Sequence, residues 1–144
     1  MTRPIILLDL NYTLVENSRE VMRSPSVYNV GVERYRTWLV DLIRDHYVIL
    51  ITARPDRYRE ETLAHMQAVL GWQPNEAWFN QKRVKAPTAK ETALLDHVFP
   101  DHGTPDVTSY LAIESNKDTS AMYASHGIPS RRQQDVAVDP SVLD

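Results

Sequence analysis

The sequence has no cysteine and only four glycines among its 144 residues. The absence of cysteine excludes disulfides, thiolate zinc sites and cysteine nucleophiles, and it favours a reducing compartment. With so few glycines, the sequence contains neither a Gly-x-x-x-x-Gly-Lys-Ser/Thr phosphate loop nor a Gly-x-Ser-x-Gly nucleophile turn. Its five histidines also lack the spacing of a zinc site. Any covalent catalysis is therefore expected to use an oxygen or nitrogen nucleophile.

A strong positive charge and a long apolar segment are absent as well. Nineteen acidic and sixteen basic residues give a net charge of -3, so no overall positive field favours nucleic-acid binding. No stretch has the length of a signal peptide core or a membrane span, and we expect a cytoplasmic protein with no membrane contact. The length and the 42% content of hydrophobic residues suit one compact domain.

Short apolar runs alternate along the chain with amphipathic helical patterns. This alternation predicts an α/β fold, a Rossmann-like parallel sheet with helices on both faces, because each crossover carries the chain back over one face of the sheet. The expected strands are residues 5–8, 47–51, 77–79, 110–113 and a short one opening at 128, and the expected helices lie within residues 33–45, 56–70, 88–98 and 118–126.

The expected domain organisation is simple. Residues 1–130 form the core domain, and the irregular segment 14–32 is a short insertion placed to cover part of a site near residue 9. The chain leaves no room for a large cap. The polar tail, residues 131–144, is expected to be disordered or loosely docked.

Polar residues follow three of the expected strands. Asp9 follows the first strand, Thr52 the second and Glu114 the fourth. The carboxyl ends of parallel strands meet at one edge of the sheet, where α/β folds place their ligands, so these residues are expected to converge there. Lys90, in the helix before the fourth strand, could join them. Such a set suits phosphoryl transfer, with a carboxylate nucleophile, a hydroxyl donor, a cation and a metal ligand.

Each of these residues also has a simpler interpretation. Asp9 and Thr52 could be ordinary turn residues, and Lys90 could be an exposed helix lysine whose place Lys82 or Lys85 takes. Basic residues after the second and third strands could contact substrate phosphates or be merely solvated. The three tryptophans show no spacing of a base-stacking platform and are expected in or beside the core.

In order and spacing, four segments resemble the motifs of the haloacid dehalogenase superfamily of hydrolases. They are Asp9–Thr13, Thr52–Pro55, Ala89–Glu91 and Glu114–Asp118. The resemblance implies a Mg²⁺-dependent phosphatase that forms an aspartyl-phosphate. The residues it assigns to catalysis are Asp9, Asn11, Thr52 and Lys90, and those it assigns to the metal are Asp9, Asn11 through its main-chain carbonyl, and Glu114.

Within that superfamily, residues 49–59, 78–83 and 113–128 are most similar to the phosphatase domain of polynucleotide kinase/phosphatase enzymes. This similarity implies a phosphorylated small molecule or a nucleic-acid phosphate end as the substrate. The residues expected to bind it are Thr52, Ala53, Arg54, Lys82 and Arg83. An open site without a large cap suits a large substrate, or closure by another copy of the chain in a homo-oligomer.

The sequence departs from the family pattern at two positions, which leaves three functions open. Asn11 replaces the aspartate that transfers protons in family phosphatases, and an amide cannot do so. Ser115 replaces the second acidic residue of the fourth motif, which predicts a weaker metal site. The first hypothesis is an impaired phosphatase, the second is a binding or regulatory protein without catalysis, and the third is dehalogenase-type chemistry at Asp9.

Overall fold

The computed structural model describes residues 3–144 and contains a five-stranded parallel sheet. The strand order is β5-β4-β1-β6-β7, and every neighbouring pair is parallel. This arrangement confirms the predicted α/β class. The strands are β1 (Ile5–Leu8), β4 (Val48–Pro55), β5 (Glu76–Asn80), β6 (Tyr110–Ile113) and β7 (Ser130–Arg131), so the last begins two residues later than expected.

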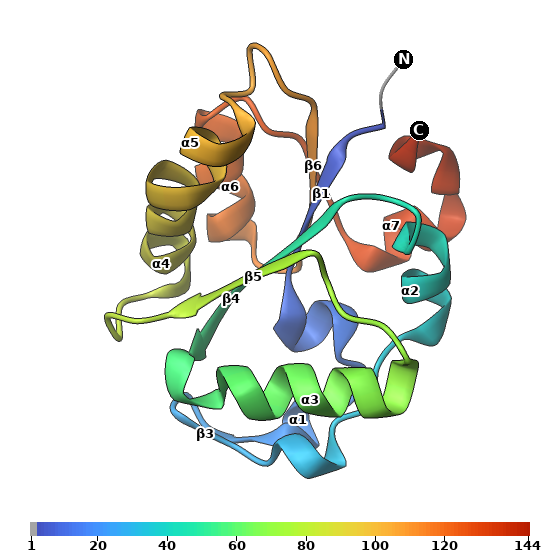
Figure 1. Cartoon of the computed structure of the whole chain (residues 1–144), viewed down its shortest axis with the longest axis vertical. Helices are drawn as coiled ribbons and strands as arrows, with labels where there is room; N and C mark the ends of the chain where they lie inside the picture. Colours follow the sequence, from blue (N-terminus) through green and yellow to red (C-terminus); the bar gives the residue numbers. More distant parts are fainter. Residues whose placement is uncertain (1–2) are drawn as a thin grey trace.

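Helices cover both faces of the sheet (Figure 1). One face carries α2 (Thr37–Ile43), α3 (Arg59–Leu70) and α7 (Gln133–Val138), and the other carries α4 (Ala86–Ala93), α5 (Phe99–His102) and α6 (Lys117–Ser125). Four of these elements, α2, α3, α4 and α6, overlap the segments for which the sequence predicted helices. Within residues 3–144, no helix combines the length and apolar character that a membrane span needs.

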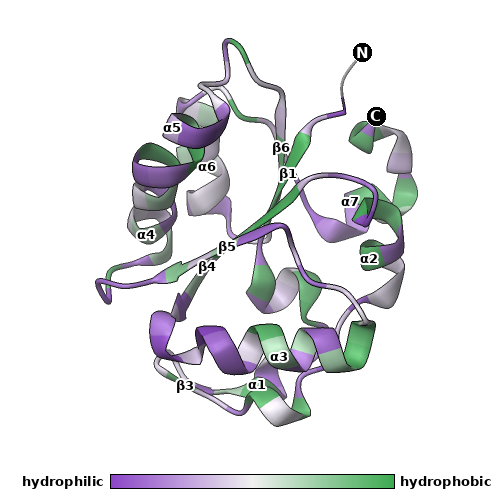
Figure 2. Ribbon diagram, in the orientation of Figure 1, coloured by the Kyte–Doolittle hydropathy of each residue, from purple (hydrophilic) through white to green (hydrophobic). Residues whose placement is uncertain are grey.

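The side chains of β1 divide between two hydrophobic cores. Ile6 and Leu8 belong to the core under α2, α3 and α7, whereas Leu7 belongs to the core under α4 and α6. Successive side chains of a strand point to opposite faces, so a fully apolar strand can serve both cores. Complete burial of each such side chain is worth about 1.5–3 kcal/mol. Figure 2 shows the resulting hydrophobic centre between more polar helix surfaces.

The helical region that begins at α4 extends further than the sequence predicted. A π-helical turn, Leu94–Val98, follows α4 and leads into α5, which ends at His102. Pro100 does not break it, because it lies in the first turn of α5, where a missing N–H group costs little. The break comes at Gly103, whose φ of 102° suits a residue without a side chain.

The carboxyl-terminal segment differs from the expected loose tail. It forms α7 and a short 3₁₀ helix, Pro140–Leu143. Val136 is completely buried and Leu143 is 3% exposed, and both belong to the core under α2. Nε2 of His46 also lies 2.8 Å from the carbonyl oxygen of Leu143. Two buried side chains in a mostly polar stretch are enough to dock the segment.

The insertion between β1 and α2 forms a small wall rather than a separate cap. It contains α1 (Ser18–Val21) and an antiparallel hairpin of β2 (Met22–Ser24) and β3 (Val27–Tyr28). The hairpin is attached to the start of α3, where the main-chain N–H of Tyr28 donates to the hydroxyl of Tyr58 at 3.2 Å. The hairpin therefore stands beside the carboxyl edge of the sheet.

Candidate functional site

The candidate site lies where the direction of the strand order reverses. From β1 the chain builds β4 and β5 on one side, and then crosses to β6 on the other side of β1. Such a reversal opens a crevice at the carboxyl ends of the central strands. Asp9 follows β1, and Glu114 follows β6, whose Ile113 is paired with Leu8. The register therefore places the two carboxylates beside each other.

Lys90 connects these two carboxylates. Its Nζ atom donates to Oδ1 of Asp9 at 2.8 Å and to Oε1 of Glu114 at 2.6 Å. All three side chains are buried. Burial disfavours the ammonium charge, but the attraction of the two carboxylates is larger and raises the pKa of Lys90. Burial and the nearby charge of Asp9 raise the pKa of Glu114 to about 7. One cation is thus shared between two acidic groups.

Two hydroxyl groups complete the surroundings of the Asp9 carboxylate. Its Oδ2 atom accepts from Oγ1 of Thr13 at 2.6 Å and from Oγ of Ser115 at 3.0 Å. Burial by itself would raise the pKa of Asp9, but Lys90 and the Thr13 hydroxyl together lower it. Asp9 is therefore held as a carboxylate. Ser115, which replaces an acidic residue of the resembled motif, has a direct role in this arrangement.

The predicted metal residues supply an incomplete set of carboxylate ligands. Within residues 3–144, no three side chains of His, Cys, Asp or Glu gather as a metal-binding group. Asp9 and Glu114 provide two carboxylates, and Oε2 of Glu114 already accepts from the main-chain N–H groups of Ser115 and Asn116 at 3.1 Å each. A cation here would need main-chain carbonyl, hydroxyl or water oxygens to complete its coordination.

Asn11 belongs to a separate buried network. Its Oδ1 accepts from Nη2 of Arg54 at 2.9 Å, and its Nδ2 donates to the hydroxyl of Tyr28 at 3.2 Å. The fully buried Arg54 also forms a two-pronged ion pair with Glu33 and donates to Oγ1 of Thr62 at 3.0 Å. The network fixes the orientation of the Asn11 amide next to Asp9.

The alternation along β4 separates the predicted residues of the second motif. Thr52 and Arg54 are buried, whereas Ala53 and Pro55 are partly exposed and line the cavity in front of Asp9. Oγ1 of Thr52 accepts from the main-chain N–H of Arg54 at 3.1 Å. Neither Thr52 nor Arg54 lines the cavity, because the strand runs on to Pro55 and directs both inward. The side-chain hydrogen bonds of the Asp9 carboxylate within residues 3–144 come from Thr13, Lys90 and Ser115, and neither Thr52 nor Arg54 is among these donors.

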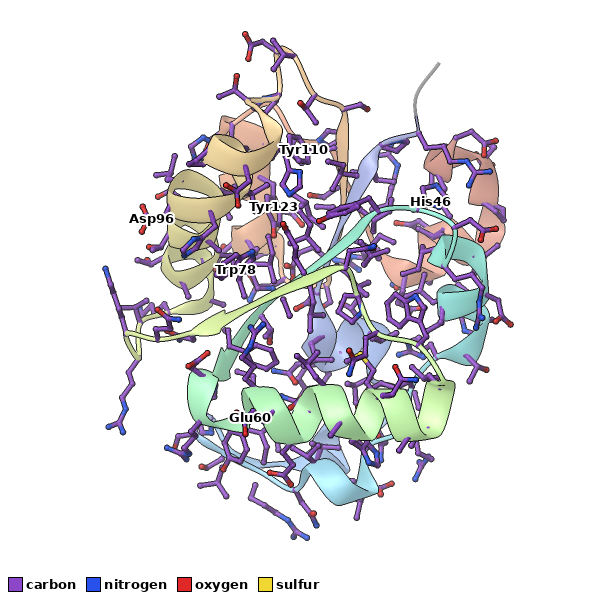
Figure 3. All side chains as sticks on the ribbon, in the orientation of Figure 1. His46, Glu60, Trp78, Asp96, Tyr110 and Tyr123 are labelled. Atoms are coloured by element: carbon purple, nitrogen blue, oxygen red, sulfur yellow. The ribbon has the colours of Figure 1, made fainter. Side chains whose placement is uncertain are left out.

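The cavity has a volume of about 520 Å³, and Asp9, Lys90 and Glu114 lie at it together. The β2–β3 hairpin contributes one wall, and the loop after β5 contributes another. Of the predicted residues, Asn11, Ala53 and Arg83 also line it, but Lys82 lines a smaller cavity beside Trp78. Figure 3 shows Trp78 between β5 and α4. Trp78 and Trp72 are partly buried against the core, as expected for the tryptophans, whereas Trp38 is 37% exposed. Lys85, which the sequence offered as an alternative to Lys90, lines it as well, and further lining residues, which the sequence did not single out, include Tyr12, Met22 and Tyr28.

Some of these contacts carried no signal in the sequence. Tyr28 lies in the irregular segment 14–32, and Glu33 stands at the start of an expected helix as one of its polar residues, so nothing linked them to Asn11 or Arg54. Thr13 and Ser115 lie inside the segments that resemble the family motifs, and their hydroxyls could have been considered as donors to Asp9.

The sequence matches no protein-family model and no curated protein. Its fold is similar to chains in two solved structures. One, of the Pnkp1/Rnl/Hen1 RNA repair complex, has a TM-score of 0.66 and 16% identity over 90% of this chain and 42% of that chain. The other, of the Pnkp1/Rnl/Hen1 complex, has a TM-score of 0.63 and 14% identity over 92% of this chain and 48% of that chain. This chain thus spans less than half of either, and the likeness is one of fold.

Proposed function

We propose that the protein is a Mg²⁺-dependent phosphohydrolase of the haloacid dehalogenase type, which acts through an aspartyl-phosphate on Asp9. The observation that carries the proposal is the position of Lys90, whose Nζ atom binds both Asp9 and Glu114 at an open cavity. A carboxylate repels a phosphate dianion, so a fixed cation beside it lowers the barrier to attack.

The donor set fits a hard cation such as Mg²⁺. The cluster has two acidic groups for one ammonium group, and the hydroxyl oxygens of Thr13 and Ser115 lie beside them. In the proposed site Asp9, the main-chain carbonyl of Asn11 and Glu114 would hold the ion in place of some of their present hydrogen bonds, with water filling the remaining positions. The ion would neutralise charge on the phosphoryl oxygens.

The hydrogen bonds of Asp9 suggest which oxygen reacts. Oδ2 accepts hydrogen bonds from two hydroxyls, whereas Oδ1 accepts one from Lys90. Among residues 3–144 no second donor is bonded to Oδ1, so one of its lone pairs can attack. In the proposed reaction Oδ1 attacks phosphorus, and the bond from phosphorus to the leaving oxygen breaks. The leaving oxygen takes a proton from water, since Asn11 cannot supply one. Water then hydrolyses the aspartyl-phosphate, which releases inorganic phosphate and restores Asp9.

Cations around the cavity favour a nucleotide or a nucleic-acid phosphate end as the substrate. Arg57, Arg83 and Lys85 line the cavity in a chain whose net charge is -3, so the positive charge is local. The similarity in fold to chains of an RNA repair complex is consistent with such a substrate. The short hairpin wall leaves space for a substrate longer than a mononucleotide.

Hydrolysis of p-nitrophenyl phosphate with and without Mg²⁺ tests the proposal. The wild type should release p-nitrophenol only with the metal, and Asp9→Asn should abolish release while the protein stays folded by circular dichroism. Asp101→Asn, a change of an exposed aspartate, serves as the matched control and should retain activity. Equal rates for wild type and Asp9→Asn would refute the assignment of the nucleophile.

A second candidate function is phosphate binding without catalysis. The observation that favours it is the fixed Asn11 amide, which occupies the position of a proton-transferring group in the resembled phosphatases and is held by Arg54 and Tyr28. In that case inorganic phosphate should bind to the wild type, and no phosphorylated Asp9 should form with any phosphate ester.

A further inference from the structure

Two residues with strained backbones line the same cavity. Among residues 3–144, the non-glycine residues with positive φ are Tyr12, at 61°, and Arg83, at 52°. They come from different elements, the turn after β1 and the loop after β5, and both line the cavity that contains Asp9. Side chains disfavour this conformation, and such strain is concentrated at functional sites.

The turn explains the backbone of Tyr12 but not its side chain. The left-handed conformation lets the flanking Asn11 and Thr13 reach Arg54 and Asp9, and the main-chain N–H of Tyr12 donates to Oγ of Ser18 at 2.7 Å. Glycine would adopt this conformation at less cost. The tyrosine ring is 50% exposed, so burial in a core does not account for it. An exposed ring beside the proposed nucleophile is available to a ligand.

The loop that carries Arg83 is held in place by Asn80. Oδ1 of Asn80 accepts from the main-chain N–H of Lys82 at 3.2 Å, and Nδ2 donates to the carbonyl of Val84 at 2.8 Å. The buried amide therefore holds the chain on both sides of the strained residue. The exposed Arg83 guanidinium is presented from a fixed loop, which reduces the entropy lost when it binds an anion.

We propose that Tyr12 and Arg83 select phosphate esters that carry a nucleobase. This inference rests on the proposed function of the Asp9 site and specifies the part of the substrate that does not react. The Tyr12 ring stacks on the base of the terminal nucleotide, and the Arg83 guanidinium pairs with phosphate oxygens. An aromatic face and a cation at one cavity match the two chemical parts of a nucleotide.

The test compares the binding of adenosine monophosphate with that of ribose 5-phosphate, which has the same phosphate and sugar but no base. The affinities are measured by isothermal titration calorimetry. EDTA is present to remove divalent cations, so the proposed Mg²⁺-dependent hydrolysis does not proceed during the measurement. The wild type should bind the nucleotide about tenfold more tightly, and Tyr12→Gly should remove this preference while Tyr12→Phe keeps it. Arg83→Gly should weaken the binding of both ligands.

Two controls separate stacking from a general effect on the fold. Tyr12→Gly should raise the melting temperature, since it relieves the strained φ angle. Tyr47, which is 40% exposed, directly precedes β4 at the end of the strand far from the cavity. Tyr47→Gly should therefore leave the preference for the nucleotide intact. Equal affinity of the wild type for the two ligands, no detectable binding of either at millimolar concentration, or retention of the preference in Tyr12→Gly would overturn the inference. Absence of turnover with this binding pattern intact would overturn only the proposed hydrolysis.

Discussion

Nη2 of Arg54 donates a hydrogen bond of 2.9 Å to Oδ1 of Asn11. An aspartate at position 11 would therefore lie against a buried guanidinium group, and its pKa would be lowered. Such a group could accept a proton from water near neutral pH, but it could not serve as a proton donor. A carboxylate at position 11 can therefore assist the hydrolysis of the aspartyl-phosphate by water, but not the departure of the leaving group.

Asn11→Asp should accordingly raise the turnover of p-nitrophenyl phosphate by about 100-fold, because its leaving group needs no acid and the new carboxylate can activate water. Glycerol 3-phosphate, whose leaving group needs a proton, should gain far less. Steady-state kcat values for the two substrates test this difference, and Asn11→Ala is the control that should gain with neither. Equal gains for both substrates would contradict the role assigned to Arg54.

Glu33→Gln should lower the free energy of unfolding by about 3–5 kcal/mol, because it leaves the buried Arg54 without its counterion. Glu16→Gln is the matched control. Glu16 pairs with Arg34 at the surface, where both side chains are more than 40% exposed, and its loss should cost less than about 1 kcal/mol. Urea unfolding measures both changes, and comparable costs would show that Arg54 is stabilised mainly by other contacts.

Lys90→Met should reduce turnover by at least about 100-fold, since no fixed cation would then face the phosphoryl group. Lys117→Met, at the exposed start of α6, provides a control that should keep most of the activity. The ratio of the two kcat/KM values is the measurement. Similar values would mean that the ammonium group of Lys90 serves stability rather than catalysis.

Val136→Ala and Val138→Ala make the same change at two positions of α7 with different exposure. Val136 is completely buried, and Val138 is 87% exposed. The first substitution should cost about 2 kcal/mol through lost burial and the cavity left behind, and the second should be nearly neutral. Thermal or urea unfolding distinguishes them, and equal effects would show that the carboxyl-terminal segment does not dock in solution.

Tyr110→Phe should change the stability of the protein at alkaline pH. Burial, together with the charge of Glu76, raises the pKa of Tyr110 to about 12, and its hydroxyl donates to the carbonyl of Gly103 at 2.5 Å. The unfolded state, with a pKa of about 10, loses this proton first, so the contribution is complete below pH 10 and disappears as pH rises to 12. The wild type should be about 1 kcal/mol more stable than Tyr110→Phe at pH 8. This gap should shrink between pH 10 and 12, and a constant gap would contradict the assignment.

The sequence predicted the meeting of Asp9 and Glu114 because both follow strands, whereas Lys90, which lies in α4, was expected there through the resemblance to the family motifs. Apolar runs locate the strands, and parallel pairing then brings their carboxyl ends together. The directions of the Thr52 and Arg54 side chains depend on how far β4 continues. The sequence predicted that the strand ends at residue 51, before Pro55, but it continues to Pro55. A shift of one residue changes the face to which every following side chain points.

The buried Arg54 could not have been predicted from composition or spacing. Arginine is normally exposed unless it is paired, and its partner Glu33 lies 21 positions earlier, where the sequence offered only a polar residue at the start of an expected helix. The docking of the tail was similarly hidden, because nothing in the sequence distinguishes the buried Val136 and Leu143 from the other few apolar residues of a polar stretch. Both features depend on tertiary contacts that local patterns do not encode.

The hairpin of β2 and β3 bounds the cavity, yet the side chains that hold Asp9 come from the β1 turn, α4 and the end of β6. One wall of the cavity and the side chains that hold Asp9 are thus encoded in separate stretches of the polypeptide. Residues 23–27 could be exchanged for a longer, shorter or differently charged turn to admit other compounds, with Tyr28 kept for its bond to Asn11 and the reactive centre left unaltered.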